Sequence, residues 1–134
     1  MGAAELRALN SIADIYASSH CSEGFGLTIA EALAAGKTVV ATDFGGSRDF
    51  LDETVGFPVE AHPVELDRDY GAYKRGVVWA RVDEGRLAER LREAAALSPT
   101  ARAVLGERAS ARMVESFSAK AIGARIERSV ADLL

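Results

Sequence analysis

The order of apolar runs and glycine-bearing loops in the N-terminal part of the chain constrains its fold more than any other feature. Leu6, Leu9 and Ala13 recur at helical spacing, which predicts an amphipathic helix over the first dozen residues. The short apolar run 15–17 then predicts a buried strand. A polar, glycine-bearing loop follows over residues 18–26.

A second helix and a second strand follow this loop. The apolar face of the predicted helix consists of Leu27, Ala30, Leu33 and Ala34, and Gly36 stands where a C-terminal cap belongs. The apolar run 39–41 predicts the second strand, which Gly45-Gly46 ends. Because crossover connections are right-handed, such a βαβ unit gives parallel strands. We therefore expect an α/β fold, a partial Rossmann-like parallel sheet, with both glycine loops at its ligand-binding edge.

The middle of the chain gives weaker signals. Residues 55–59 are compatible with another short strand, and residues 61–76, which are mixed and charged, read as a long surface loop. The apolar run 77–79 is ambiguous, and Trp79 is expected in the core rather than against a ligand.

The C-terminal part, about residues 84–134, is expected to form roughly three helices. Asp83 can cap the first, and Ser98, which precedes a proline, the second. Ser118 can cap the third. The inward faces are expected to be Leu87, Leu91 and Ala94 in the first helix and Ile122, Ile126, Val130 and Leu133 in the last.

Length and charge narrow the class of protein. The 134 residues fit one domain, and a net charge of −4 with scattered basic residues argues against a nucleic-acid partner. A single cysteine, Cys21, allows no internal disulfide and favours a reducing, cytoplasmic setting. His20 adjoins it, but neighbouring loop residues rarely form a nucleophilic pair. Two histidines and one cysteine make no convincing metal site.

The segment Glu23–Ala32 carries the strongest chemical signal. Gly24 and Gly26 lie directly before a predicted helix, where free N–H groups and a partial positive charge suit a pyrophosphate. Glu23 and Glu31 bracket this position, and carboxylates suit the hydroxyl groups of sugars better than phosphate. A nucleotide diphosphate sugar has a hydroxyl-bearing ring on each side of its pyrophosphate, so the arrangement is suited to such a ligand.

The pair Glu23 and Glu31, with seven residues between them, resembles the motif of the group 1 retaining glycosyltransferases. The resemblance is carried by residues 18–32, the strand 39–43 and Gly45-Gly46, and it is strongest over residues 14–60. Those enzymes have the GT-B architecture of two Rossmann-like domains, and the motif lies in the C-terminal, donor-binding domain. The resemblance implies that residues 1–134 are one incomplete nucleotide-sugar-binding domain.

The resemblance also implies roles for individual residues. Glu23 would be the catalytic residue, contacting the transferred sugar, and Glu31 would bind the ribose. The implied donor-binding residues are Gly24, Phe25, Gly26, Leu27, Thr28 and Glu31. Among these, the backbone N–H groups of residues 25–27 would meet the sugar and the distal phosphate, and the Thr28 hydroxyl would lie near the phosphates. No catalytic metal is expected, because fixed donors stabilise the leaving diphosphate.

Other interpretations stay open at this point. Thr28 and Glu31 have the spacing of a capping box, so Glu31 could serve only its helix, and Glu23 could be a solvated loop residue. The resemblance also implies further strands, with additional phosphate-binding cations, upstream of the segment that residues 1–134 represent. The chain is therefore expected to be part of a larger transferase acting on an unknown acceptor. The alternatives are a non-catalytic nucleotide-binding module that needs a partner chain, or a remnant that self-associates through an exposed sheet edge.

Overall fold

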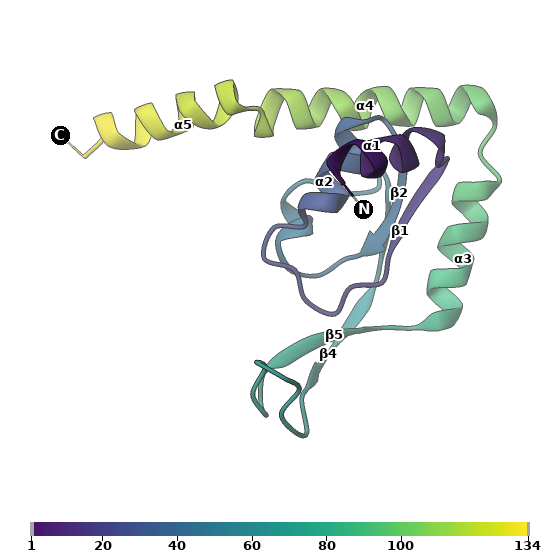
Figure 1. The fold of residues 1–134 in the computed structure, drawn as a ribbon, viewed down its shortest axis with the longest axis vertical. Helices are drawn as coiled ribbons and strands as arrows, with labels where there is room; N and C mark the ends of the chain where they lie inside the picture. Colours follow the sequence, from purple (N-terminus) through teal and green to yellow (C-terminus); the bar gives the residue numbers. More distant parts are fainter. Residues whose placement is uncertain (1, 134) are drawn as a thin grey trace.

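Three parallel strands form the centre of the fold (Figure 1). The computed structural model describes residues 2–133. In it β1 (Ile15–Ser18) pairs with β2 (Thr38–Thr42), and β2 pairs with β3 (Phe57–Val59), giving the order β1-β2-β3. The predicted parallel βαβ unit is confirmed.

Helices cover both faces of this sheet. The helices α2 (Leu27–Ala34) and α4 (Pro99–Phe117) pack on one face, and α3 (Glu84–Ala95) packs on the other. Since successive side chains of a strand point to opposite faces, Val39 faces α2 and α4 while its neighbour Val40 faces α3. All five residues of β2 are buried, which explains its unbroken β-branched and apolar sequence.

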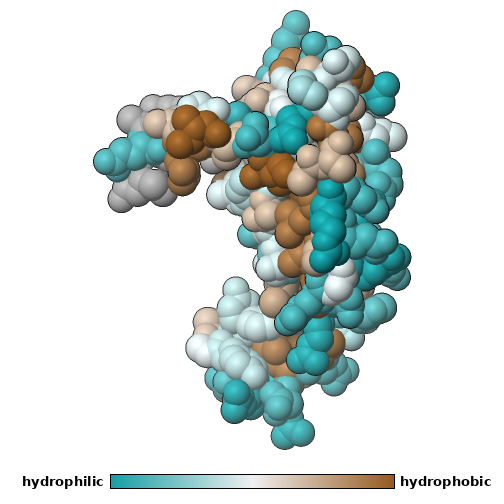
Figure 2. Space-filling view, turned by 90° about the vertical axis from the view of Figure 1, so that its right-hand side faces the viewer, coloured by the Kyte–Doolittle hydropathy of each residue, from teal (hydrophilic) through white to brown (hydrophobic). Residues whose placement is uncertain are grey.

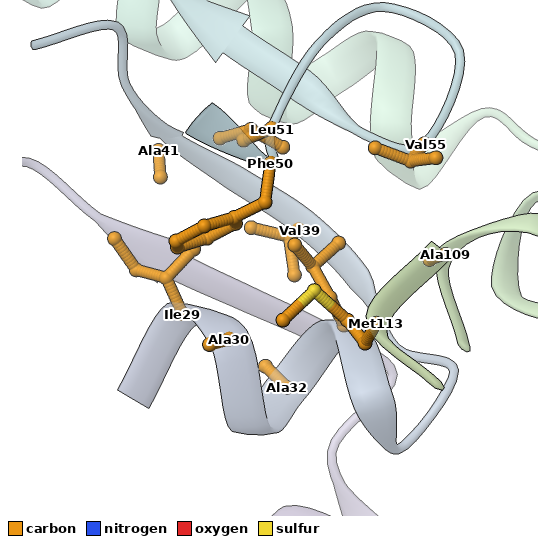
Figure 3. Packing of buried hydrophobic residues seen from close by; sticks show 11 residues of the cluster. Ile29, Ala30, Ala32, Val39, Ala41, Phe50, Leu51, Val55, Ala109 and Met113 are labelled. Atoms are coloured by element: carbon orange, nitrogen blue, oxygen red, sulfur yellow. The ribbon is translucent and has the colours of Figure 1, made fainter. Parts of the chain in front are cut away.

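The larger core lies on the α2 and α4 side (Figure 3). Its buried members are Ile29, Ala30, Ala32, Leu33, Val39, Ala41, Phe50, Leu51, Val55, Ala109 and Met113. The smaller core on the α3 side consists of Val40, Val59 and Ala94, with the half-buried Leu87 and Leu91 packed against it. The inward face predicted for α3 is therefore confirmed.

The three predicted helix caps are all present. The side chain of Asp83 accepts a hydrogen bond from Arg86 N at 2.9 Å and starts α3. Ser98 caps α4, and Ser118 caps α5 (Ala119–Ala131) in the same way.

The prediction of a surface loop over residues 61–76 is wrong for the first part of that range. Residues Ala61–Glu65 form β4, which pairs antiparallel with β5 (Val78–Val82), so Val78 and Trp79 of the ambiguous apolar run belong to a strand. Alternation of polar and apolar residues is weak in β4, because both faces of this hairpin are largely exposed. In Figure 1 the hairpin lies at the opposite end of the molecule from α4 and α5.

Several predicted inward faces point to solvent instead. Leu27 is 69% exposed and Ala34 is also exposed, because α2 buries the face with Ile29 and Leu33. The predicted last stripe is exposed as well, at Ile122, Ile126 and Val130 in α5 and at Leu133 beyond its end.

The remaining differences concern element ends and the first helix. The expected strand 55–59 begins only at Phe57, because Val55 belongs to a turn in which its N–H bonds Asp52 O. The first helix, α1 (Ala3–Ile12), is confirmed as a helix and leaves Leu9 half exposed. The prediction for the side chain of Leu6 lies outside what the structure describes. No helix in the described part of the chain is long and apolar enough to cross a membrane.

Candidate functional site

The loop between β1 and α2, residues 19–26, carries the predicted site and lies at the carboxyl edge of the sheet. The short helix η1 (Gly45–Asp49), which follows β2, meets this loop. Gly46 N donates a hydrogen bond to Glu23 O at 3.0 Å. The two glycine loops that follow neighbouring strands are thus in direct backbone contact, as parallel strand ends should be.

Only glycine fits at this contact. A Cβ atom on Gly46 would lie 2.1 Å from Gly24 O and 2.7 Å from Phe25 Cα, and one on Gly45 would lie 2.5 Å from Glu23 O. The sequence predicted that Gly45-Gly46 ends a strand and lies at the ligand-binding edge, but it did not predict a contact with the motif loop. The structure shows that these two glycines form the surface on which the motif loop rests.

His20 joins the same two loops through its ring. Nε2 lies 2.9 Å from Phe44 O, and Nδ1 lies 3.3 Å from Ser18 Oγ. Because a carbonyl oxygen only accepts, Nε2 carries the proton and Nδ1 accepts from the serine hydroxyl. His20 therefore acts as a bridge between loops, consistent with the expectation that it forms no nucleophilic pair with Cys21.

A third contact holds the loop from the hairpin side. Ala80 N, in β5, donates a hydrogen bond to Cys21 O at 2.7 Å. Nothing in the sequence indicated this bond, because it joins backbone groups of two segments that are distant along the chain.

The start of α2 is left uncapped by protein. Gly26 is its N-cap, in the left-handed conformation with φ +88°, and no side chain bonds the first turn. The first helical hydrogen bond runs from Ala30 N to Gly26 O at 2.9 Å. Since the first N–H groups of a helix have no intrahelical partner, this end of α2 can bind an anion.

The capping-box interpretation of Thr28 and Glu31 is wrong. Thr28 lies inside the helix rather than at its N-cap, and its hydroxyl accepts a hydrogen bond from Tyr16 OH at 2.8 Å. The proton of the Thr28 hydroxyl remains available, and the residue is exposed.

The ring of Phe25 anchors the loop to the core. Its centroid lies 5.1 Å from that of Phe50 and 5.9 Å from that of Phe117, and those two rings are 5.5 Å apart. Such tilted and edge-on pairs add to the stabilisation that burial provides. The loop backbone on either side of Phe25 is thus held in one place.

The two carboxylates differ in environment. Glu23 is half-buried in the loop, whereas Glu31 is exposed on α2, one turn into the helix. The cations Arg48 and Lys37 are both engaged within the protein. Arg48 forms a bidentate pair with Asp43, at 3.0 and 3.2 Å, and Lys37 Nζ bonds Ser11 O at 2.9 Å.

The pair with Asp43 also raises the pKa of Arg48, first through its hydrogen bonds and then through its charge. Among residues 2–133, no group of three or more His, Cys, Asp and Glu side chains is placed to hold a metal ion.

Comparison with solved structures defines the class of fold. The chain matches sucrose-phosphate synthase from Thermosynechococcus elongatus with a TM-score of 0.63 and 23% sequence identity, over 96% of this chain and 27% of that chain. This confirms the expected fold class, an α/β domain of the GT-B C-terminal type. The chain therefore spans about a quarter of the length of this neighbour.

Comparison with protein families identifies the group. Residues 2–112 match the model of the group 1 glycosyl transferases, and the chain belongs to this family. No curated protein matches the sequence. The resemblance inferred from the sequence is thus confirmed at the level of the family, while the roles of Glu23, Gly24, Phe25, Gly26, Leu27, Thr28 and Glu31 stay predictions.

Proposed function

We propose that this chain supplies the donor-binding segment of a retaining glycosyltransferase, which transfers a sugar from a nucleotide diphosphate sugar to an acceptor. The observation that carries this proposal is the uncapped start of α2, which lies between Glu23 and Glu31. The loop that leads into it is held by backbone bonds from Gly46 N and Ala80 N. A binding site built on a fixed backbone stabilises a leaving diphosphate without reorganisation during the reaction.

Each part of the site has a chemical role in this proposal. The N–H groups of the first turn of α2 bind the pyrophosphate, and the free proton of the Thr28 hydroxyl adds a donor there. Glu31 accepts hydrogen bonds from the ribose hydroxyls, and Glu23 accepts them from the transferred sugar. Backbone donors then replace a metal, so transfer is expected without one.

The test is an amide-resolved NMR titration with UDP, GDP and ADP, each with and without an attached sugar. We expect shifts confined to residues 24–31, and their loss in Glu31→Ala. The matched control is Glu127→Ala, which removes another exposed carboxylate, on α5. If no nucleotide shifts these amides at millimolar concentration, the chain does not bind donor by itself and the proposal fails for it.

A second candidate function is a non-catalytic module that acts with a partner chain or a second copy. The observation in its favour is that β1 is an edge strand of the described sheet, pairing only with β2. Edge strands offer unpaired backbone groups to another strand. Light scattering over a range of concentrations tests self-association. A monomer at every concentration would exclude association with a second copy and leave a partner chain as the remaining form of this function.

A further inference from the structure

The side chains of Tyr16 and Thr28 form a hydrogen bond that ties β1 to the first turn of α2. The two hydroxyl oxygens lie 2.8 Å apart. Tyr16 is the second residue of β1, and Thr28 is the second residue of α2. The bond therefore joins an edge strand of the described sheet to the helix end at which the donor diphosphate is proposed to bind.

The core fixes the position of the Tyr16 hydroxyl. The tyrosine ring is half-buried and packs against the larger core, which contains Ile29 and Leu33 of α2. A tyrosine side chain has only two χ angles, so a ring held by packing leaves its hydroxyl oxygen in one place. Thr28, by contrast, is exposed, and threonine in a helix divides between two rotamers. The bond from Tyr16 can therefore select the rotamer of Thr28.

The phenol is the donor in this bond. A phenolic O–H is more acidic than an aliphatic one and is the better donor, so the Tyr16 proton points at Thr28 Oγ1. An oxygen that accepts a hydrogen bond in one direction keeps its own proton for another direction. The bond thus also selects the side of the Thr28 oxygen from which a proton is donated.

The position of Thr28 leaves this proton without an acceptor in the helix. A threonine inside a helix commonly donates to the carbonyl group three or four residues earlier. Because Thr28 is the second residue of α2, those carbonyl groups belong to the loop rather than to a preceding helical turn. The backbone N–H groups of residues 27–29 also have no helical acceptor, since the first helical bond starts at Ala30 N. The hydroxyl proton adds a side-chain donor to these backbone donors.

We propose that Tyr16 is a positioning residue of the donor site, which directs the Thr28 hydroxyl toward the diphosphate of the donor. The inference rests on the proposed function, and Tyr16 acts through Thr28 without touching the ligand. In the bound state, a chain of hydrogen bonds runs from the Tyr16 hydroxyl to the Thr28 hydroxyl and on to a phosphate oxygen. Each bond in such a chain polarises the next, so Tyr16 strengthens the bond that Thr28 donates.

The direction of this chain determines which ligand it favours. Its last group is a donor, so the chain stabilises an anion and offers nothing to a cation. The negative charge on the leaving diphosphate grows as its bond to the sugar breaks. The hydrogen bond from Thr28 is therefore strongest at that stage of the transfer, where stabilisation accelerates the reaction.

A double-mutant cycle tests the coupling between the two residues. Tyr16→Phe keeps the ring in the core and removes only its hydroxyl, and Thr28→Val keeps the branched shape and removes the second hydroxyl. Dissociation constants for UDP, GDP and ADP are measured by the same NMR titration in the wild type, both single variants and the double variant. We expect Tyr16→Phe to weaken binding about fivefold and Thr28→Val about tenfold. The double variant should match Thr28→Val, because Tyr16 acts only through Thr28.

A second readout needs no ligand. Three-bond couplings across the χ1 bond of Thr28 report its rotamer populations, and one rotamer should dominate in the wild type. In Tyr16→Phe the couplings should average over more than one rotamer. A loss of stability elsewhere in the fold would not change them. Unchanged couplings in Tyr16→Phe would overturn the proposal.

The hairpin provides a matched control. Tyr70 and Tyr73 pack against Trp79, with ring centroids 5.7 and 5.2 Å away, and these three rings form the hairpin cluster. The hairpin forms the lower lobe of the molecule in Figure 2 and lies apart from α2 in Figure 1. Tyr73→Phe makes the same chemical change as Tyr16→Phe, and it should alter neither nucleotide binding nor the couplings of Thr28.

The outcomes separate this proposal from the proposed function. A double variant weakened about fiftyfold, the product of the two single effects, would show that Tyr16 and Thr28 act independently and would refute the positioning role. If a nucleotide shifts the amides of residues 24–31 with equal affinity in the wild type and in Tyr16→Phe, the donor site stands and the role of Tyr16 is refuted. If no nucleotide binds the wild type, the proposed function fails and the role of Tyr16 fails with it.

Discussion

The parallel sheet and the hairpin hold the same loop in different ways. In the sheet, β2 is buried along its whole length, and the glycines that follow it press backbone against backbone on residues 23–25. The hairpin buries little, and it contacts the loop through one backbone bond from Ala80 N to Cys21 O. The difference indicates that the sheet fixes where the loop lies, whereas the hairpin can change without unfolding the domain.

The largest effect is expected at the glycine contact. Gly46→Ala would place a methyl group 2.1 Å from Gly24 O, so either the loop or η1 has to move. We expect a loss of roughly 3 kcal/mol in the free energy of unfolding, measured by urea titration. Gly24→Ala is the control, since nothing lies within 4 Å of its added methyl. Equal stability of the two variants would show that the sheet does not fix the loop.

A pair of aromatic substitutions compares the two regions directly. Phe50→Ala empties a fully buried position in the larger core and should cost roughly 3–5 kcal/mol in urea unfolding. Trp79→Ala removes the centre of the hairpin cluster and should cost less than about 1 kcal/mol globally, because a hairpin can open on its own.

Hydrogen exchange then locates the effect of Trp79→Ala. The amides of Leu66, Gly76 and Val77 should exchange faster, while those of β2 should not change. A similar loss of global stability in both variants would contradict the independence of the hairpin.

The smallest effect concerns two ion pairs, one in each region. Burial alone would raise the pKa of Asp52, but hydrogen bonds from Thr54 and Arg112 outweigh it and hold that pKa below its ordinary value. The folded state therefore gains stability from Asp52 above about pH 4, and loses it as the pH falls through the lowered pKa. Arg112→Ala should cost about 1 kcal/mol at pH 7, and less below pH 4.

The corresponding pair in the hairpin, Lys74 with Asp69, is exposed. Bonds from Lys74 Nζ and Arg75 N lower the pKa of Asp69. Lys74→Ala should therefore have the same direction of pH dependence but should act only on hairpin exchange rates. A change in its urea midpoint would show that the hairpin and the sheet unfold together.

The same contrast explains how much of the fold the sequence could predict. The run Val39-Val40-Ala41 is continuous because β2 is buried on both faces, and such a run is easily recognised. The strand β4 carries His62 and Pro63 opposite Arg81 and Ala80, and its exposure on both faces leaves no alternation to read. The helical spacing of the apolar residues in α5 correctly predicts a helix. Whether that apolar face is buried depends on packing against other elements, which the spacing does not determine.

The candidate site divides in the same way. The spacing of Glu23 and Glu31 around two glycines could be recognised because consecutive residues create it. The contact of Gly46 with Glu23 and the bridge from His20 to Phe44 could not, because they join backbone groups from separate segments. The pair Gly45-Gly46 was the one sequence signal for this contact, since adjacent glycines allow two backbone segments to approach closely.

The bonds that hold the motif loop also affect its electrostatic character. The carbonyl oxygens of Cys21 and Glu23 are occupied by Ala80 N and Gly46 N. An occupied carbonyl is turned toward its donor, and its negative partial charge is largely neutralised there. A polyanion approaching the start of α2 therefore meets less repulsion from the backbone of the loop, while the N–H groups at the positive end of the helix remain free of a side-chain cap. Segments distant in sequence thus reduce the negative potential of the loop backbone without contributing a charged side chain.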